Sequence, residues 1–151
     1  MHNNEALRRI AAALPLDEQD LARVIDLAGL SQRLPEPAGL LLDPDDEGHI
    51  PCDDATLVAL LDALIVLRRG ASKGAPPPAA KANNNLVLKK LRIALDLRDQ
   101  DMLALFEVAG VHLRRSQLGA LFRAEGNKHF TACTDGQLLC FLTALGRRQS
   151  A

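Results

Sequence analysis

The chain has 151 residues, of which 48% are hydrophobic, so it has enough apolar side chains for one medium domain or two small ones to bury a core. No stretch approaches the roughly 20 apolar residues of a membrane span, and the N-terminus lacks the apolar segment of a secretory signal, so we expect a cytoplasmic protein. Three cysteines without a C-x-x-C pair argue against a disulfide framework and a zinc ribbon.

The two halves of the chain differ in charge, although the net charge is only −1. Residues 1–70 contain 6 Lys and Arg against 13 Asp and Glu, a net of −7, whereas residues 83–151 contain 10 against 6, a net of +4. Such an asymmetry indicates either a polyanionic partner or two halves that attract one another.

Four short helices are expected in the first half. Residues 3–14 carry an apolar stripe with the i, i+3, i+7 spacing of one helical face. The second helix runs from about residue 18 to a glycine at position 29, a residue type suited to the position after a helix. The third covers LPEPAGLLL, with a proline acceptable in its first turn, and the fourth begins near residue 53 and continues through LVALLDALIVL.

The same pattern recurs in the second half. NNNLVLKKLRIAL, residues 83–95, is a stronger version of HNNEALRRIAAAL, residues 2–14, and a shift of 81 residues aligns apolar positions along both halves. Pairing His49 with His129 requires a local offset of one residue. Agreement in order over the whole of each half predicts a tandem duplication.

The two copies are separated by GASKGAPPPAAKA, whose glycines and three consecutive prolines cannot continue a helix. No strand pattern is present. We therefore predict an all-α protein that is a tandem duplication of a roughly 68-residue four-helix unit joined by a Gly/Pro/Ala-rich linker. The acidic first copy is placed at residues 1–70, the linker at 71–82 and the basic second copy at 83–149.

Several helix starts are marked by residues that cap helices. Asparagine side chains accept hydrogen bonds from the free N–H groups of a first turn, and Thr134 and Gln137 have the T-x-x-Q spacing of a capping box. The predicted helix N-caps are Asn3, Asn4, Asn84, Asn85 and Thr134.

Four segments, NNNLVLKKLRIAL, FEVAGV, SQLGALFR and HFTACTDGQLLCFLTAL, together resemble the bacterial YehS-like family of unknown function. The resemblance covers nearly the whole chain, but the first copy departs more, with LPEPAGLLLDPD where the second has RRSQLGALFRAE. It implies a small soluble bacterial protein of duplicated helical architecture, and it implies no activity, cofactor or catalytic residue.

The basic second copy is a candidate for nucleic-acid binding, because clustered cations neutralise phosphates. The candidate residues are Lys89, Lys90, Arg92, Arg114, Arg115, Arg123 and Lys128. DQDMLALFEVAGVHLRRSQLGALFR also has the outline of a helix-turn-helix, although the connecting segment is longer than the usual three to four residues. The four phenylalanines fall at core-like spacings, which disfavours base stacking. The alternative interpretation is a solvated basic face.

Metal binding and catalysis have weaker support. His49 with Cys52 and His129 with Cys133 could supply a Cys₂His₂ site, but the spacings H-x-x-C and H-x-x-x-C differ. The sequence contains no G-x-S-x-G, no phosphate-binding glycine loop and no H-E-x-x-H. We therefore expect no metal site, no cofactor, no catalytic residue and no small-molecule substrate.

The interpretation we favour is a non-enzymatic binding or scaffold protein that acts through its helical repeats on a protein partner or on itself. The alternative is a nucleic-acid-binding protein that uses the second copy. Neither interpretation involves a membrane.

Overall fold

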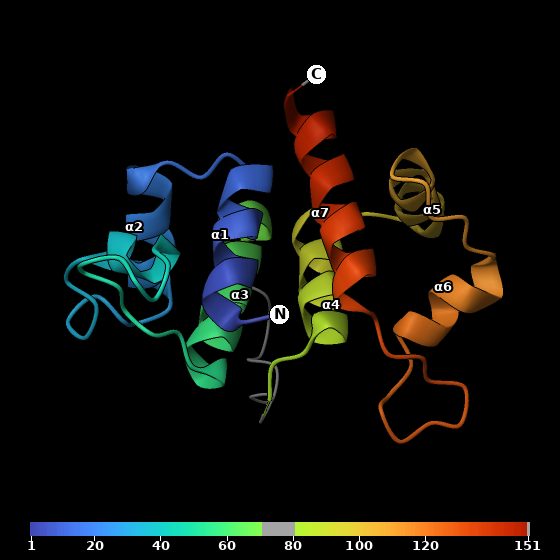
Figure 1. Ribbon diagram of the computed structural model, residues 1–151, viewed down its shortest axis with the longest axis horizontal. Helices are drawn as coiled ribbons and strands as arrows, with labels where there is room; N and C mark the ends of the chain where they lie inside the picture. Colours follow the sequence, from blue (N-terminus) through green and yellow to red (C-terminus); the bar gives the residue numbers. More distant parts are fainter. Residues whose placement is uncertain (71–80, 151) are drawn as a thin grey trace.

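The computed structural model of the chain describes residues 1–70 and 81–150, apart from the side chains of 149 and 150. Within these ranges every regular element is a helix and there is no strand (Figure 1), which confirms the all-α prediction. Most of the predicted linker, 71–82, lies outside the described residues. No helix in the described ranges is long and apolar enough to cross a membrane.

Each copy contributes four helical elements. The first copy contains α1 (Asn3–Ala13), α2 (Glu18–Leu27), the 3₁₀ helix η1 (Pro37–Leu41) and α3 (Asp54–Arg69). The second contains α4 (Asn84–Ala94), α5 (Asp99–Val108), α6 (Arg115–Leu121) and α7 (Asp135–Ser150). Two prolines in LPEPAGLLL remove N–H donors from the third element of the first copy, which forms one short 3₁₀ helix where the second copy forms α6.

Three predicted helix boundaries are confirmed by the backbone. Gly29 follows α2 with φ 73° and Gly110 follows α5 with φ 85°, and both occupy the left-handed region that glycine adopts without strain. At the start of α7, the Thr134 hydroxyl accepts from the Gln137 N–H, and the Gln137 side chain accepts from the Thr134 N–H, each at 3.0 Å. This pair is the predicted capping box.

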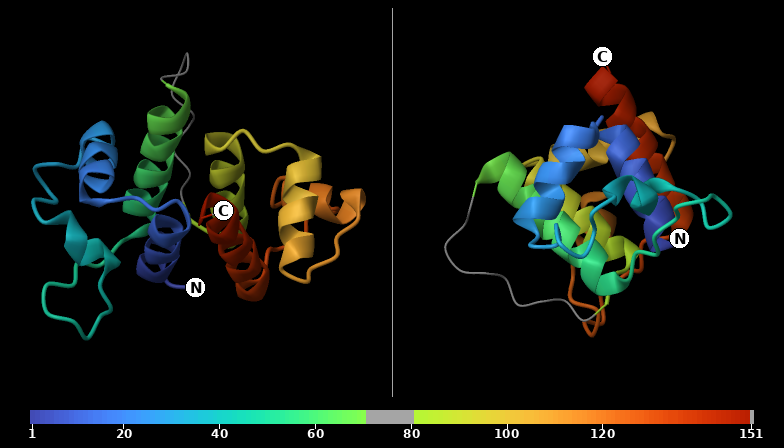
Figure 2. Two further views of the ribbon diagram at one scale, coloured as in Figure 1. Left: turned by 90° about the horizontal axis from the view of Figure 1, so that it is seen from above. Right: turned by 90° about the vertical axis from the view of Figure 1, so that its left-hand side faces the viewer.

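The two copies pack against each other through their first and last helices. α1 packs against α7 and α3 packs against α4, while α2 with η1 and α5 with α6 lie on the two outer sides (Figures 1 and 2). Because α1 corresponds to α4 and α3 to α7, exchanging the copies exchanges the two contacts. The buried apolar side chains form one cluster that runs through both copies. The apolar faces of the repeated helices are therefore covered within the chain.

The predicted apolar stripe of the first helix is buried. Leu7, Ile10 and Leu14 are at most 5% exposed, and Leu88 and Leu91 in the second copy are fully buried. Removing such a side chain to alanine typically costs about 2–5 kcal/mol, so these stripes hold a large share of the folding free energy.

A salt bridge crosses one of the two inter-copy contacts. Lys90 Nζ on α4 contacts Asp62 on α3, and the Lys90 side chain is only 11% exposed. At the equivalent place between α1 and α7 the residues are Arg9 and Thr143, and Arg9 pairs instead with Glu5 of its own helix at 3.2 Å. The two contacts therefore share their apolar packing but not this ion pair. Lys90 lies inside the interface between the copies.

Asn85 connects three segments of the second copy. Its side-chain N–H groups donate to the carbonyls of Leu121, at the end of α6, and Thr131, in the loop before α7, both at 2.9 Å. Its side-chain oxygen accepts from the Cys133 N–H at 2.8 Å. Asn4 makes the equivalent three hydrogen bonds in the first copy, with Leu40, Ile50 and Cys52, each 81 positions before its counterpart. A single amide thus fixes the start of α4, the end of α6 and the segment entering α7.

Asn84 connects the start of α4 to the start of α7. Its side chain donates to the Cys133 carbonyl at 3.0 Å and to the Asp135 carboxylate at 2.7 Å. Asn3 makes the equivalent bonds to Cys52 and Asp54. Each pair of asparagines therefore bonds to backbone 36–49 residues further along the chain and to a carboxylate 51 residues further along.

These contacts correct the capping assignment. The prediction that the helices are capped by Asn3, Asn4, Asn84 and Asn85 is wrong, because all four lie inside a helix and their side chains point to distant backbone. The N-cap of α4 is Asn83, whose side-chain oxygen accepts from the Leu86 N–H at 2.8 Å. The N-cap position of α1 is His2, whose side chain makes no capping bond.

The shared hydrogen bonds also correct the alignment of the copies. Ile50 and Thr131 accept the same bond from equivalent asparagines, so the shift of 81 residues holds here without interruption. His49 consequently corresponds to Phe130. The pairing of His49 with His129 was wrong. It matched two histidines by residue type, whereas the equivalent hydrogen bonds show that the shift of 81 residues continues through this segment.

Alanine substitution of the three consecutive asparagines tests these roles. Asn83→Ala removes one capping bond and should cost about 1 kcal/mol of unfolding free energy. Asn85→Ala leaves two carbonyls and one N–H without their partner and should cost about 3 kcal/mol. Urea unfolding monitored by circular dichroism measures both, and equal costs at the two positions would contradict the assignment.

Acid should weaken the fold through Asp54 and Asp135. A hydrogen bond from Asn3 lowers the pKa of Asp54, and one from Asn84 lowers the pKa of Asp135. Because each folded pKa lies below the unfolded value of about 3.9, each carboxylate stabilises the fold above that pH, and the contribution is lost as the pH falls through the folded pKa.

We expect the double variant Asp54→Asn/Asp135→Asn to lose less stability than the wild type when the pH is lowered from about 5 to about 2. Urea unfolding across this range measures the difference. Parallel pH profiles for the two proteins would show that neither carboxylate contributes.

Candidate functional site

Two of the predicted nucleic-acid-binding residues already pair with other side chains of the protein. Lys90 pairs with Asp62 between the copies. The Arg92 guanidinium pairs with Asp99 and lies over the ring of Phe122, 4.8 Å from its centroid. These contacts stabilise the second copy and its interface, so the assignment of Lys90 and Arg92 to a free binding surface is not supported by their geometry.

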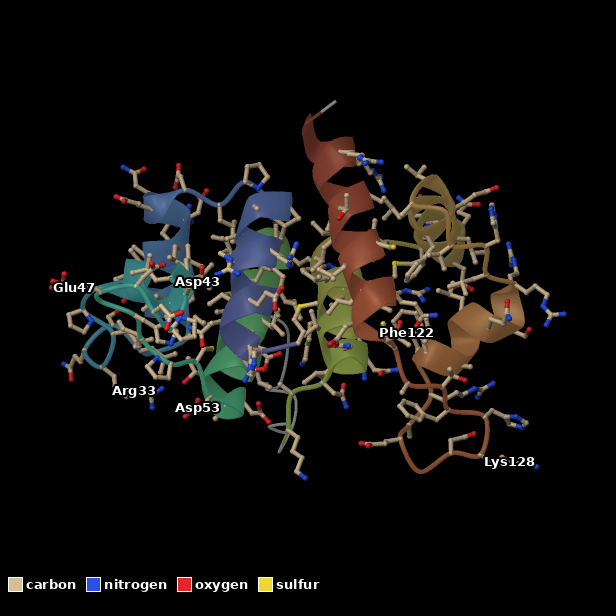
Figure 3. The ribbon with its side chains drawn as sticks, in the orientation of Figure 1. Arg33, Asp43, Glu47, Asp53, Phe122 and Lys128 are labelled. Carbon is tan, nitrogen blue, oxygen red and sulfur yellow. The ribbon has the colours of Figure 1, made fainter. Side chains whose placement is uncertain are left out.

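The other five predicted cations are exposed and form no ion pair among the described residues, but they do not form one cluster. They are Lys89, Arg114, Arg115, Arg123 and Lys128. Arg114 and Arg115 lie at the start of α6, and Lys128 lies at the outer edge of the loop between α6 and α7 (Figure 3). Lys89 and Arg123 line the same surface hollow.

This hollow has a volume of about 400 Å³ and lies between the start of α4 and the end of α6. We call it the basic hollow and define it by Lys81, Lys89, Arg123, Leu86, Phe122 and Phe130. Asn83, Asn85 and the carboxylate of Glu125 also line it. Its cations come from three separate segments of the chain, and its apolar part includes two aromatic rings.

The phenylalanines divide into two pairs. Phe106 and Phe141 are fully buried, with ring centroids 5.6 Å apart, as their spacing predicted. Phe122 and Phe130 are partly exposed and line the basic hollow (Figure 3 shows Phe122 beside α6 and α7). The interpretation of all four as core residues was therefore wrong for Phe130, whereas the partly exposed Phe122 packs against the core.

The first copy neutralises the equivalent cation. Arg8 corresponds to Lys89 and forms an ion pair with Asp43, in the loop after η1. Asp43 corresponds to Ala124, so the second copy has no carboxylate in that place. Lys89 consequently forms no ion pair among the described residues, whereas Arg8 is paired, and the carboxylate that lines the basic hollow is that of Glu125.

The loop before the last helix packs against a glycine in the first copy and against an alanine in the second. In the first copy Gly39 allows the loop to approach closely, because a Cβ at this position would lie 2.3 Å from the Gly48 carbonyl oxygen. The equivalent of Gly39 is Ala120, which carries that Cβ. Both copies keep a backbone bond at this place, from the Ile50 N–H to the Gly39 carbonyl at 2.9 Å and from the Thr131 N–H to the Ala120 carbonyl at 3.0 Å, so Ala120 excludes only an approach like that of Gly48.

The predicted helix-turn-helix outline is present in a shortened form. α5 and α6 are joined by residues 109–114, longer than the usual turn, and α6 has only 7 residues, a length of about 10 Å. The equivalent element of the first copy is a 3₁₀ helix. A recognition helix in a DNA major groove therefore has little structural support here.

The histidine and cysteine pairs do not gather into a metal site in the part of the chain that is described, where no three His, Cys, Asp or Glu side chains are arranged to hold a metal. Cys52 and Cys133 are buried, and burial raises the pKa of both thiols to about 11. At neutral pH both remain thiols, a state unsuited to nucleophilic attack.

Comparison with known proteins places the chain among relatives of undefined activity. The profile of the family described as "Protein of unknown function (DUF1456)" matches the chain twice, at residues 3–70 and 84–149. The chain is 35% identical over 151 residues to "Uncharacterized protein YehS" of Escherichia coli (strain K12), covering 99% of this chain and 97% of that protein. No solved structure matches the chain. The resemblance and the tandem duplication expected from the sequence are both confirmed.

The raised thiol pKa values predict slow alkylation. At pH 8, iodoacetamide should modify Cys52 and Cys133 at least ~100-fold more slowly than a cysteine in an unstructured peptide, because a smaller fraction is thiolate. Mass spectrometry of peptides from timed samples measures both rates, with urea-unfolded protein as the control. Alkylation of the folded protein at the peptide rate would contradict the assigned burial.

Proposed function

Because the chain belongs to the DUF1456 family, whose description names no reaction or ligand, we propose a function from the residues of the chain itself. We propose that it is a non-catalytic protein that binds nucleic acid through its second copy. The observation that carries the proposal is the basic hollow, whose Lys89 and Arg123 have no anionic partner among the described residues.

The charge distribution supports a polyanionic ligand on this side of the molecule. The second copy has a net charge of +4 and the first a net charge of −7, so a polyanion is attracted to one copy and repelled by the other. Arg114, Arg115 and Lys128 add exposed cations to the same copy. These three lie outside the basic hollow, so the cations grouped for phosphate contact are Lys81, Lys89 and Arg123 in the hollow itself.

Our favoured interpretation was a binding or scaffold protein that acts on a protein partner or on itself, and the shared core weakens the second of these two forms. The apolar stripes of the first helices are buried in the core that the two copies of one chain share. A protein partner remains the second candidate because of two exposed apolar residues at equivalent positions, Leu27 at 50% and Val108 at 63% exposure. Val108 borders a groove between α5 and α7, lined by Leu105 and Ala144.

A binding titration of the full chain tests the proposal. Fluorescence anisotropy with a labelled oligonucleotide, at about 50 mM salt and above, should show binding that weakens as salt rises. In Lys89→Ala/Arg123→Ala, affinity should fall about tenfold or more, and the slope of log K against log salt should decrease by about 1.5, because each lost phosphate contact removes about 0.7–0.9.

The matched control is Arg23→Ala/Arg68→Ala, which removes the same charge from exposed positions in the first copy. This variant should bind as the wild type does. Equal losses in the two double variants would show a nonspecific effect of net charge, and no binding of the wild type at about 50 mM salt would refute the function.

A further inference from the structure

The basic hollow combines cations with an aromatic ring that has no role in the core. Phe130 is partly exposed, lines the hollow, and is absent from the apolar residues that pack against the core, whereas Phe122 is among them. Arg92 already lies over the ring of Phe122. Of the two rings in the hollow, Phe130 is therefore the one available to a ligand.

The equivalent of Phe130 in the first copy has a different role. His49 occupies that position, and its Nδ1 lies 2.8 Å from the Leu42 carbonyl oxygen, so the ring is tied to its own loop. The second copy thus differs in two ways in one hollow: among the described residues Lys89 forms no ion pair, and the side chain at position 130 is an aromatic ring without the loop contact that His49 makes.

This combination recognises an unpaired base together with its phosphates. Base stacking on aromatic side chains beside a cationic groove is the usual mode of single-strand binding. The bases of a duplex are stacked on each other and do not enter a hollow, whereas unpaired bases can be splayed out. The volume of about 400 Å³ lies within the range of small-molecule sites.

We infer that the basic hollow binds one unpaired base of a single-stranded nucleic acid, with the base against Phe130 and its adjoining phosphates on Lys89 and Arg123. The inference rests on the proposed function and defines its ligand. Glu125, the acid lining the hollow, serves as an acceptor for the N–H groups of the base.

The test compares a labelled single strand of about 12 nucleotides with a blunt duplex of the same sequence, using the full chain. The single strand should bind at least about tenfold more tightly. Phe130→Ala should lose about tenfold in affinity for the single strand and leave duplex binding unchanged, while Phe130→Tyr, which keeps the ring, should bind as the wild type does. An unchanged urea midpoint for each variant shows that the fold is intact.

The outcomes separate the two proposals. Equal affinity for single strand and duplex, or an unchanged affinity in Phe130→Ala, would overturn the base-binding inference while leaving the proposed function intact. If neither nucleic acid binds, both proposals fail.

Discussion

Each copy has an apolar face on its first and last helices that the other copy covers. α7 packs on α1 and α4 packs on α3, so the four helices form a central bundle with one core (Figure 2). This constraint places Lys90 inside the interface and removes the apolar stripes from the surface. It also means that the duplication supplies, within one chain, the partner that a single copy would need.

Within each copy, the paired asparagines hold the outer elements against the bundle. Asn4 and Asn85 each join the first helix to the end of the third element and to the backbone before the last helix. Because Asn85 and Leu121 also line the basic hollow, the contact that closes the second copy positions the candidate site as well.

The two copies share these asparagine hydrogen bonds and differ in the charged residues nearby. The ion pair of Arg8 with Asp43 belongs to the first copy alone, since the second has Lys89 and Ala124 at those positions. The first copy thus pairs the cation at this position, while the second places the equivalent Lys89 in the basic hollow. This difference within a single chain is the main support for assigning binding to the second copy.

The sequence predicted the features that depend on local spacing: the repeat, the helices, the glycines that follow α2 and α5, and the capping box at Thr134. It failed for Asn84 and Asn85, because an asparagine that caps a helix and one that bonds to distant backbone present the same local pattern. The pairing of Lys90 was likewise invisible, since its partner lies on the other copy. Lys81 was missed because the composition of residues 71–82 assigned that segment to the linker. Phe130 was missed because its spacing from the other phenylalanines resembled that of a core residue.

The central claim is that the two copies fold as one core, and separate expression of residues 1–70 and 83–151 tests it most directly. Circular dichroism and urea unfolding should show that neither fragment alone unfolds cooperatively, and that mixing them restores a cooperative transition. Two fragments that each fold alone, with unfolding free energies matching that of the intact chain, would contradict the shared core.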